Sequence, residues 1–406
     1  MPSVFAPEVI KKSLKLSDRK LLILLAAGSL TTMAGGVVAP ILPDIVQELS
    51  LDPGLAANLV SMHCLTLALF SPPLGILADK IGRVKVLIAS LVFYALFGVA
   101  GAFMHSFTPL LVTRALIGAA SGGIAAASLG LLANMYEGEE RSQALGYATS
   151  TLTIAGILFP LLGGAIGNGH WRFAFCLYGL AVPLAIGVIS ILPPEQKIAK
   201  VTESSYKLTQ VLRQPLTLWL LVTLSLVSIS MYSVVVYAPL YLKVTIGAGA
   251  ILNGVVLASR AIGAAVISAL GSKWLAQKLG LSKAIMLGCA LMSVTLTTIP
   301  LLDRLGWIII TAIFFGVGFG IVLPNVYSVL ANIAVPRLKS SVLAAGTGAG
   351  FLGQFLSPII LRPLLNYGGL ELVFYGAASV SVVAGILTLL LSRNDRDFAN
   401  LNPPSV

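Results

Sequence analysis

The sequence reads Gly75-Ile-Leu-Ala-Asp79-Lys80-Ile-Gly82-Arg83-Val-Lys85 between two long apolar segments. Each flanking segment is long enough to cross a bilayer, since about 20 apolar residues span the hydrocarbon core as a helix. The stretch is therefore predicted to be a turn at the membrane surface, with glycines that allow two helices to approach closely. Asp79 can accept hydrogen bonds at a helix end, and the three cations mark the cytoplasmic side.

The composition of the whole chain agrees with a membrane protein. Of its 406 residues, 57% are hydrophobic and only 10% are charged, whereas soluble domains contain about 25% charged residues. The apolar runs are continuous rather than alternating, which indicates helices and not a β-barrel. Three cysteines lie far apart in apolar segments without metal-ligand spacing, and we expect them to be buried thiols: Cys64, Cys176 and Cys289.

The chain contains twelve apolar runs of about membrane length, with the longest polar break after the sixth. We expect twelve transmembrane helices, at about 21–43, 55–78, 84–104, 108–134, 142–166, 171–192, 216–242, 250–272, 283–301, 306–331, 340–362 and 370–392. The predicted organisation is a cytoplasmic tail (1–20), a six-helix bundle (21–192), a cytoplasmic linker (193–215), a second six-helix bundle (216–392) and a cytoplasmic tail (393–406).

The distribution of positive charge tests this map, because cytoplasmic loops of membrane proteins are enriched in lysine and arginine. With both termini in the cytoplasm, the inside segments carry 20 of the 26 lysines and arginines and the outside segments carry 4. Arg114 and Arg260 remain inside predicted helices. The net charge of +11 thus follows from orientation and does not indicate a nucleic-acid partner.

The two halves of the chain repeat at an offset of 198 positions. Leu77-Ala-Asp-Lys-Ile-Gly82 corresponds to Leu275-Ala-Gln-Lys-Leu-Gly280, and further glycines, a proline and an asparagine recur at the same offset. One example is Gly118 with Gly316. Two parallel repeats related along the membrane normal are a known architecture of secondary transporters.

The charged turn closely resembles the loop 2–3 signature of the major facilitator superfamily, G-x-L-A-D-[KR]-x-G-[RK]-[KR]. The resemblance implies an all-α membrane fold of two pseudo-symmetric six-helix bundles that transports by alternating access. Asp79 would pair with Arg83 or with a helix terminus of the other half as a cytoplasmic latch; a purely structural loop cap is the alternative. The predicted gate motif comprises Gly75, Asp79, Lys80, Gly82, Arg83 and Lys85.

Three further helices resemble the drug/proton antiporters of this superfamily. Leu110-Leu-Val-Thr-Arg114-Ala-Leu-Ile-Gly118 is similar to the helix-4 motif L-x-x-x-R-x-x-Q-G, which implies a role for Arg114 in proton coupling, unless its side chain extends to the membrane surface. Ala39-Pro-Ile-Leu-Pro43 is similar to the helix-1 string P-x-L-P-x-I, but Gly36 stands where many relatives have an acid.

Helix 5 reads Ala155-Gly-Ile-Leu-Phe159-Pro160-Leu-Leu-Gly163-Gly164, similar to the antiporter motif G-x-x-x-G-P-x-x-G-G. Pro160, Gly163 and Gly164 are the predicted helix-5 hinge. Phe159 and Ala155 replace two of the glycines, so antiport is favoured rather than established by this motif. A proline-kinked helix with no bearing on the direction of transport is the alternative.

Interior charge bears on the substrate. All fifteen acidic residues fall in tails, loops or helix ends, whereas Arg260 lies about 15 Å into a helix at 1.5 Å per residue. Interior cations without an interior anion predict neutral or anionic substrates, unless helix carbonyls or a nearby acid neutralise Arg260. Other polar candidates for substrate or proton contact, each with helix packing as the alternative, are His63, Tyr237, Asn325 and Gln354.

The second half contains two glycine-rich strings, Gly316-Val-Gly318-Phe-Gly320 and Gly346-Thr-Gly348-Ala-Gly350. Neither is followed by the Lys-Ser/Thr of a nucleotide-binding loop. We therefore expect no nucleotide, cofactor or metal, no catalytic residue, and energy from a gradient. The predicted function is proton-coupled efflux of small amphipathic compounds by a monomer in the inner (plasma) membrane. A dedicated exporter of one metabolite, such as an organic acid, siderophore or sugar, is the first alternative, and a membrane-embedded enzyme or lipid scramblase is a remote one.

Overall fold

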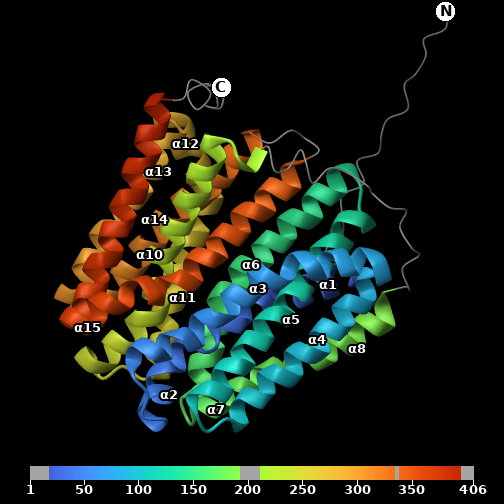
Figure 1. Ribbon diagram of the computed structural model, residues 1–406, viewed down its shortest axis with the longest axis horizontal. Helices are drawn as coiled ribbons and strands as arrows, with labels where there is room; N and C mark the ends of the chain where they lie inside the picture. Colours follow the sequence, from blue (N-terminus) through green and yellow to red (C-terminus); the bar gives the residue numbers. More distant parts are fainter. Residues whose placement is uncertain (1–17, 193–210, 334–337, 395–406) are drawn as a thin grey trace, which may run out of the picture.

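The computed structural model describes residues 18–192, 211–333 and 338–394, and these ranges contain helices and no strand. Most of the predicted tails and linker therefore lies outside the described residues. The helices are α1 (Arg19–Gly36), α2 (Leu42–Glu48), α3 (Pro53–Ile81), α4 (Arg83–Ala100), α5 (Phe107–Met135), α6 (Gly138–Gly167), α7 (Trp171–Ala174), α8 (Ala181–Ile191), α10 (Pro215–Ile246), α11 (Ala250–Leu270), α12 (Ser272–Leu279), α13 (Leu281–Thr298), α14 (Leu305–Ile333) and α15 (Lys339–Asn394) (Figure 1).

The predicted all-α membrane fold is confirmed. Within the described ranges, 11 helical segments are long and apolar enough to cross a membrane. The last of them contains non-helical backbone at Gly368 and Gly369. Gly369 has φ 70°, a left-handed conformation that glycine adopts without steric cost. This segment of 50 residues therefore supplies two crossings, giving the twelve that the apolar runs predict.

Two crossings are less regular than the sequence suggests. The first consists of α1, a 3-10 turn at Ala39–Ile41 and α2, and Pro40 stands at the start of that turn. The sixth consists of α7, a 3-10 segment at Phe175–Leu180 and α8. Proline cannot donate the backbone hydrogen bond that continues an α-helix, which accounts for the first break. Apolar periodicity locates a crossing but does not reveal such breaks.

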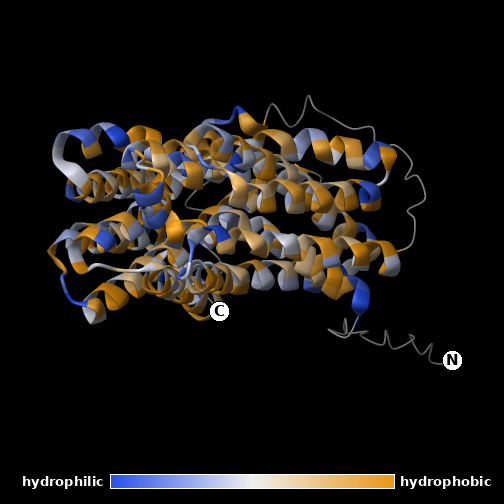
Figure 2. Cartoon of the chain, turned by 90° about the horizontal axis from the view of Figure 1, so that it is seen from below, coloured by the Kyte–Doolittle hydropathy of each residue, from blue (hydrophilic) through white to orange (hydrophobic). Residues whose placement is uncertain are grey.

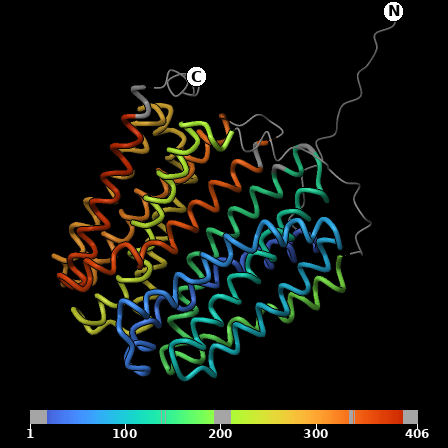
Figure 3. Tube along the Cα trace, viewed as in Figure 1, coloured from blue at the N-terminus to red at the C-terminus, as the bar shows by residue number. Residues whose placement is uncertain are grey.

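The chain packs as two halves of similar construction. In the first half α5 packs against α3 and α4, and in the second half α14 packs against α11 and α13. The blue-to-green and lime-to-red parts of Figure 3 trace these halves. A Cβ atom at Gly118 would clash with the backbone of His63 in α3, and one at Gly316 would clash with the backbone of Arg260 in α11. The sequence repeat thus corresponds to two equivalent close helix crossings.

The halves are joined at one end of the molecule. The helix pairs α6–α11 and α3–α15 make the main contacts between them. Their helices meet at the lower left of Figure 1 and then run in different directions. We call the end that contains Asp44 and Asp52 the joined end, and the end that contains Asp79 the motif end.

The outer surface is largely apolar. Many large hydrophobic side chains are exposed, among them Phe93, Phe173 and Ile186, and Figure 2 shows hydrophobic residues over much of this surface. Cys64 and Cys289 are buried, but Cys176 is exposed, so the prediction of three buried thiols was wrong for Cys176. The reason is that lipid is as apolar as the helix interior, so an apolar run does not say which of its residues face outward.

Candidate functional site

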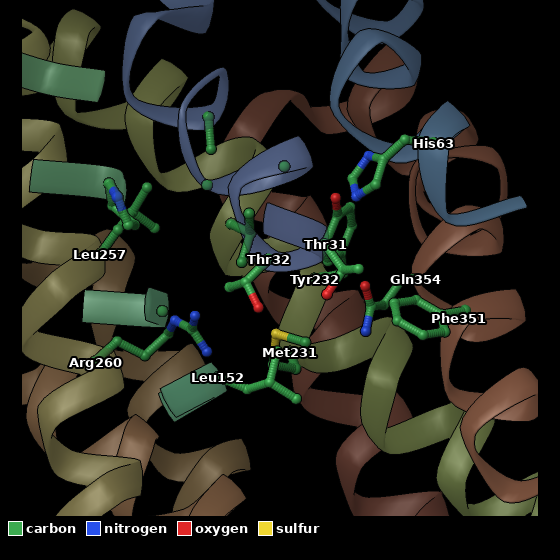
Figure 4. Close-up of a pocket in the computed structure, with 16 residues that line it drawn as sticks. Thr31, Thr32, His63, Leu152, Met231, Tyr232, Leu257, Arg260, Phe351 and Gln354 are labelled. Carbon is green, nitrogen blue, oxygen red and sulfur yellow. The ribbon is translucent and has the colours of Figure 1, made fainter. Parts of the chain in front are cut away.

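A cavity of about 270 Å³ lies between the two halves. Helices α1, α3 and α6 line it from the first half, and α10, α11 and α15 line it from the second (Figure 4). Its lining residues are Thr31, Thr32, Gly35, Gly36, Ala39, His63, Leu152, Gly156, Pro160, Met231, Tyr232, Val235, Leu257, Arg260, Phe351 and Gln354. A site shared by both halves is the place where relative movement of the halves changes access.

The polar lining falls into two groups. Figure 4 shows Arg260 on one side of the cavity and His63, Tyr232 and Gln354 on the other. Met231 and Leu152 contribute apolar surface. The cavity is therefore amphipathic, with a cation at one side and hydrogen-bonding groups at the other.

The second polar group also joins the halves. The Tyr232 hydroxyl in α10 donates to the Val60 carbonyl in α3 at 2.8 Å. The Cys64 thiol in α3 donates to Gln354 Oε1 in α15 at 3.2 Å. His63 Nε2 lies 3.4 Å from Cys64 Sγ, while His63 Nδ1 is buried without a hydrogen-bond partner in the described structure. This cluster gives the cavity a polar wall that spans both halves.

Arg114 lies in the first half and is not among the cavity-lining residues. Its side chain is fully buried and therefore does not extend to the membrane surface. Its guanidinium donates to the Leu59 carbonyl at 3.0 Å, to the Tyr178 hydroxyl at 2.9 Å and to the Ala34 carbonyl. These contacts tie α5 to three neighbouring elements. The predicted role in proton coupling remains a prediction.

Arg260 differs from Arg114 in its position relative to the cavity and in its hydrogen bonds. It lines the cavity, and its Nε is buried without a hydrogen-bond partner. Within the part of the chain that the structure describes, no carbonyl or carboxylate pairs with its guanidinium. The sequence left open that helix carbonyls or a nearby acid neutralise Arg260, and the described structure contains neither contact. Arg260 is partly buried, and an unpaired cation at membrane depth is energetically costly, which makes Arg260 the strongest electrostatic feature of the cavity.

Two of the polar residues expected from sequence pack between helices instead of lining the cavity. The Tyr237 hydroxyl donates to the Pro358 carbonyl at 3.4 Å. Asn325 Nδ2 donates to the Ile321 carbonyl at 2.7 Å and to Ser272 Oγ at 3.2 Å. His63 and Gln354 do line the cavity.

Sequence reasoning missed several lining residues, including Thr31, Thr32, Met231 and Phe351. Their residue types are ordinary in membrane helices. The signal that could have found Thr31 and Thr32 is a pair of hydroxyl residues within the first apolar run.

The gate motif lies at the motif end of the first half. Arg83 donates to Asp79 at 2.7 Å and to the Gly130 carbonyl at 2.9 Å. Gly82 has φ 105°, so the turn requires a glycine at this position. Lys80 and Lys85 are exposed. These contacts fix the turn against α5, and the proposed latch across the halves remains a prediction.

The predicted hinge residues of the fifth crossing lie in α6 and make close contacts at the joined end. Pro160 lines the cavity. A Cβ atom at Gly163 would lie 2.6 Å from the Val37 carbonyl, and one at Gly164 would clash with the Ala250 carbonyl of α11. Small residues let helix backbones approach in this way. Their predicted action as a hinge remains untested.

Polar contacts across the halves also lie at the joined end. Lys243 pairs with Asp44 at 3.3 Å, and Arg362 pairs with Asp52 at 3.7 Å. Asn253 Nδ2 donates to the Pro40 carbonyl at 3.1 Å. In the described ranges, no group of three or more metal-binding side chains occurs.

A central cavity shared by two repeated helical halves, with the halves joined at one end, is the arrangement of membrane transport proteins built from structural repeats. The chain belongs to the Major Facilitator Superfamily, whose model matches residues 24–358 and 245–405. It is therefore an integral membrane transporter of a small molecule rather than an enzyme.

Comparison with known proteins adds relatives and structural neighbours. The Quinolone resistance protein NorA of Staphylococcus aureus (strain MSSA476) is 26% identical over 381 residues, which cover 89% of this chain and 93% of that protein. The class H Tetracycline resistance protein of Pasteurella multocida is 25% identical over 177 residues, covering 42% and 44% of the two chains.

A bacterial homolog of the human lysosomal transporter Spinster has the same fold. Its inward-facing and occupied crystal structure has a TM-score of 0.76 at 15% identity, covering 95% of this chain and 98% of that one. The unoccupied inward-facing structure has a TM-score of 0.76 at 16% identity.

Proposed function

We propose that this protein exports small amphipathic compounds, neutral or anionic, from the cytoplasm across the plasma membrane in exchange for protons. The observation that carries the proposal is the amphipathic cavity between the halves. The relatives named as quinolone and tetracycline resistance proteins support export as the direction.

The charge distribution supports the orientation. The motif end carries the basic turn at Lys80, Arg83 and Lys85, and basic loops favour the cytoplasmic side. With that end in the cytoplasm, the joined end faces outside. The described conformation, joined at the outside, then suits the step in which an exporter receives its substrate from the cytoplasm.

His63 is our candidate for the proton-binding group. It is the histidine among the cavity-lining residues, and an imidazole nitrogen can bind and release a proton. The groups around it are Arg114 on α5, Cys64 on α3 and Tyr232 on α10, with Arg260 on the other side of the cavity. The positive charge of Arg114 would act on His63 directly.

Export of one defined metabolite is the second candidate. The cavity volume of about 270 Å³ lies just below the range of about 300–1,000 Å³ for sites that hold drug-sized ligands. A compact cavity with a single cation favours a narrow range of substrates. We place an organic acid ahead of a siderophore or sugar in this alternative, because Arg260 offers a partner for a carboxylate.

Purified protein in proteoliposomes tests the proposal. A pH gradient is imposed, a pH-sensitive dye reports internal pH, and neutral, anionic and cationic amphiphiles are added in turn. Proton movement that depends on an added neutral or anionic compound is the expected result. Tracer uptake without proton movement would instead indicate a uniporter or a different coupling ion, and the response to one compound among many would favour the second candidate.

A further inference from the structure

We propose that the cavity binds a compact organic anion, a carboxylate on a one- or two-ring apolar body, with Arg260 as its anion-binding group. This inference rests on the proposed function for the identity of the transport site. It narrows the substrate from neutral or anionic amphiphiles to anions and assigns the recognising residue.

The first argument is the contrast between the two membrane-embedded arginines. Arg114 donates to three oxygen atoms of the protein and is fully buried. Arg260 makes no such contact in the described structure, and its Nε is buried and unpartnered at the cavity. A cation at membrane depth is usually paired or faces a water-filled cavity. Arg114 therefore has the contacts of a structural residue, and Arg260 has the unused donors of a binding residue.

The second argument concerns nearby negative charge. The cavity lining contains no aspartate or glutamate. Two acids at the interface of the halves, Asp44 and Asp52, are already paired with Lys243 and Arg362. The described residues thus offer Arg260 no counter-charge of their own. An incoming carboxylate would supply one, and guanidinium–carboxylate pairs are among the stronger hydrogen-bonded contacts.

The third argument concerns how firmly Arg260 is held. Gly316 in α14 packs directly against the backbone carbonyl of Arg260, as Gly118 in α5 packs against that of His63. The two side chains therefore enter the cavity from equivalent, closely packed helix crossings in opposite halves. A fixed backbone limits how far the guanidinium can withdraw from the cavity, so the cation remains where a ligand can reach it.

The rest of the cavity fits the body of such a ligand. Leu152, Met231 and Phe351 supply apolar surface, and Tyr232 and Gln354 supply hydrogen-bonding groups opposite Arg260. The volume of about 270 Å³ suits one or two rings rather than a large drug. The chemistry that matches this lining is an aromatic or aliphatic carboxylate.

Binding to the full-length protein in detergent tests the inference without relying on proton coupling. The probes share one apolar body and differ in charge: 2-naphthoate, 2-naphthylmethanol and 2-naphthylmethylammonium. The variants are Arg260→Gln, which removes the charge, and Arg260→Lys, which keeps the charge but loses the planar fork. Arg304→Gln is the matched control, because Arg304 is exposed and the change in net charge is the same.

We expect the native protein to bind 2-naphthoate on the order of tenfold more tightly than the alcohol, and the ammonium compound most weakly. Arg260→Gln should remove this preference, Arg260→Lys should retain part of it, and Arg304→Gln should leave it unchanged. Equal binding of the three probes, or an anion preference that survives in Arg260→Gln, would overturn the inference. Anion-selective binding without proton movement in proteoliposomes would support Arg260 as the anion-binding group. The same result would rule out proton coupling in the proposed function.

Discussion

Asp44 and Lys243 lie 199 positions apart, each four residues after a proline of the internal repeat, and their side chains pair across the two halves at 3.3 Å. An exact repeat would place the same residue at both positions. Because the two sites meet, identical charges there would repel each other. The halves instead carry opposite charges, so the repeat diverges at a contact that helps to hold the joined end together.

We predict that Asp44→Asn shifts the protein toward conformations in which the joined end is open. The pair is partly exposed, at 38% for Lys243 and 30% for Asp44, so its contribution is about 0.5 kcal/mol and the shift about twofold. Spin labels at Gly169 and Val244 would report the distance across this end. Only Cys176 needs replacement beforehand, since Cys64 and Cys289 are buried.

The control for this prediction is charge reversal, with Asp44→Lys combined with Lys243→Asp. The double variant should restore the native distance distribution, whereas Asp44→Lys alone should widen it more than Asp44→Asn does. An unchanged distribution in all three variants would show that helix packing alone holds this end.

We predict that Arg114→Met lowers the thermal stability of the protein in detergent. The substitution removes three hydrogen bonds from a buried cation, a loss on the order of 2–4 kcal/mol. Arg260→Gln should leave the midpoint of thermal unfolding unchanged or raise it, because that guanidinium has no described partner. If Arg114→Met kept the native midpoint of thermal unfolding but lost proton movement, the result would instead support the proton-coupling role. That role is the one implied by the resemblance of the fourth crossing, α5, to the antiporter motif.

We predict that Gly164→Ala reduces the rate of transport. The added Cβ would meet the backbone carbonyl of Ala250 in α11, and overpacking of this kind costs about 1–3 kcal/mol. The joined end would then be harder to close, so the transport cycle should slow by about fivefold or more. Gly146→Ala in the same helix is the control, since nothing lies within 4 Å of its added Cβ. Equal rates for the two variants would argue against tight α6–α11 contact during the cycle.

We predict that His63→Asn abolishes substrate-dependent proton movement but retains exchange of labelled for unlabelled substrate at equal pH. Asparagine keeps hydrogen-bonding capacity but cannot take up a proton near neutral pH. His105→Asn is the matched control, because His105 is exposed. Intact proton coupling in His63→Asn would place the proton site elsewhere.

The sequence predicted the crossings well because their cause is local. Each run of about 20 apolar residues must form a helix in lipid, where every backbone polar group needs an internal partner. The turn at Gly82 could also be predicted from sequence, because its positive φ requires glycine. The repeat was visible at Gly118 and Gly316, since each meets another helix's backbone and no larger residue fits.

The cavity was predicted less completely because a helix has several faces and hydropathy does not distinguish them. His63, Arg260 and Gln354 line it, whereas Tyr237 donates to Pro358 in α15 and Asn325 donates to Ser272 in α12. Cys176 faces outward although it lies in an apolar run. In each case the residue type is the same for either environment, and only the rotation of the helix decides between them.

The sequence by itself determined the number of crossings, the repeat and the charged turn, because each depends on residues close together or on a fixed spacing along the chain. The tertiary structure alone decided which membrane arginine has hydrogen-bond partners within the protein. Arg114 finds oxygens on three other elements and Arg260 finds none in the described residues. The physical reason is that the cost of a buried charge depends on the partners that distant segments bring within hydrogen-bonding distance.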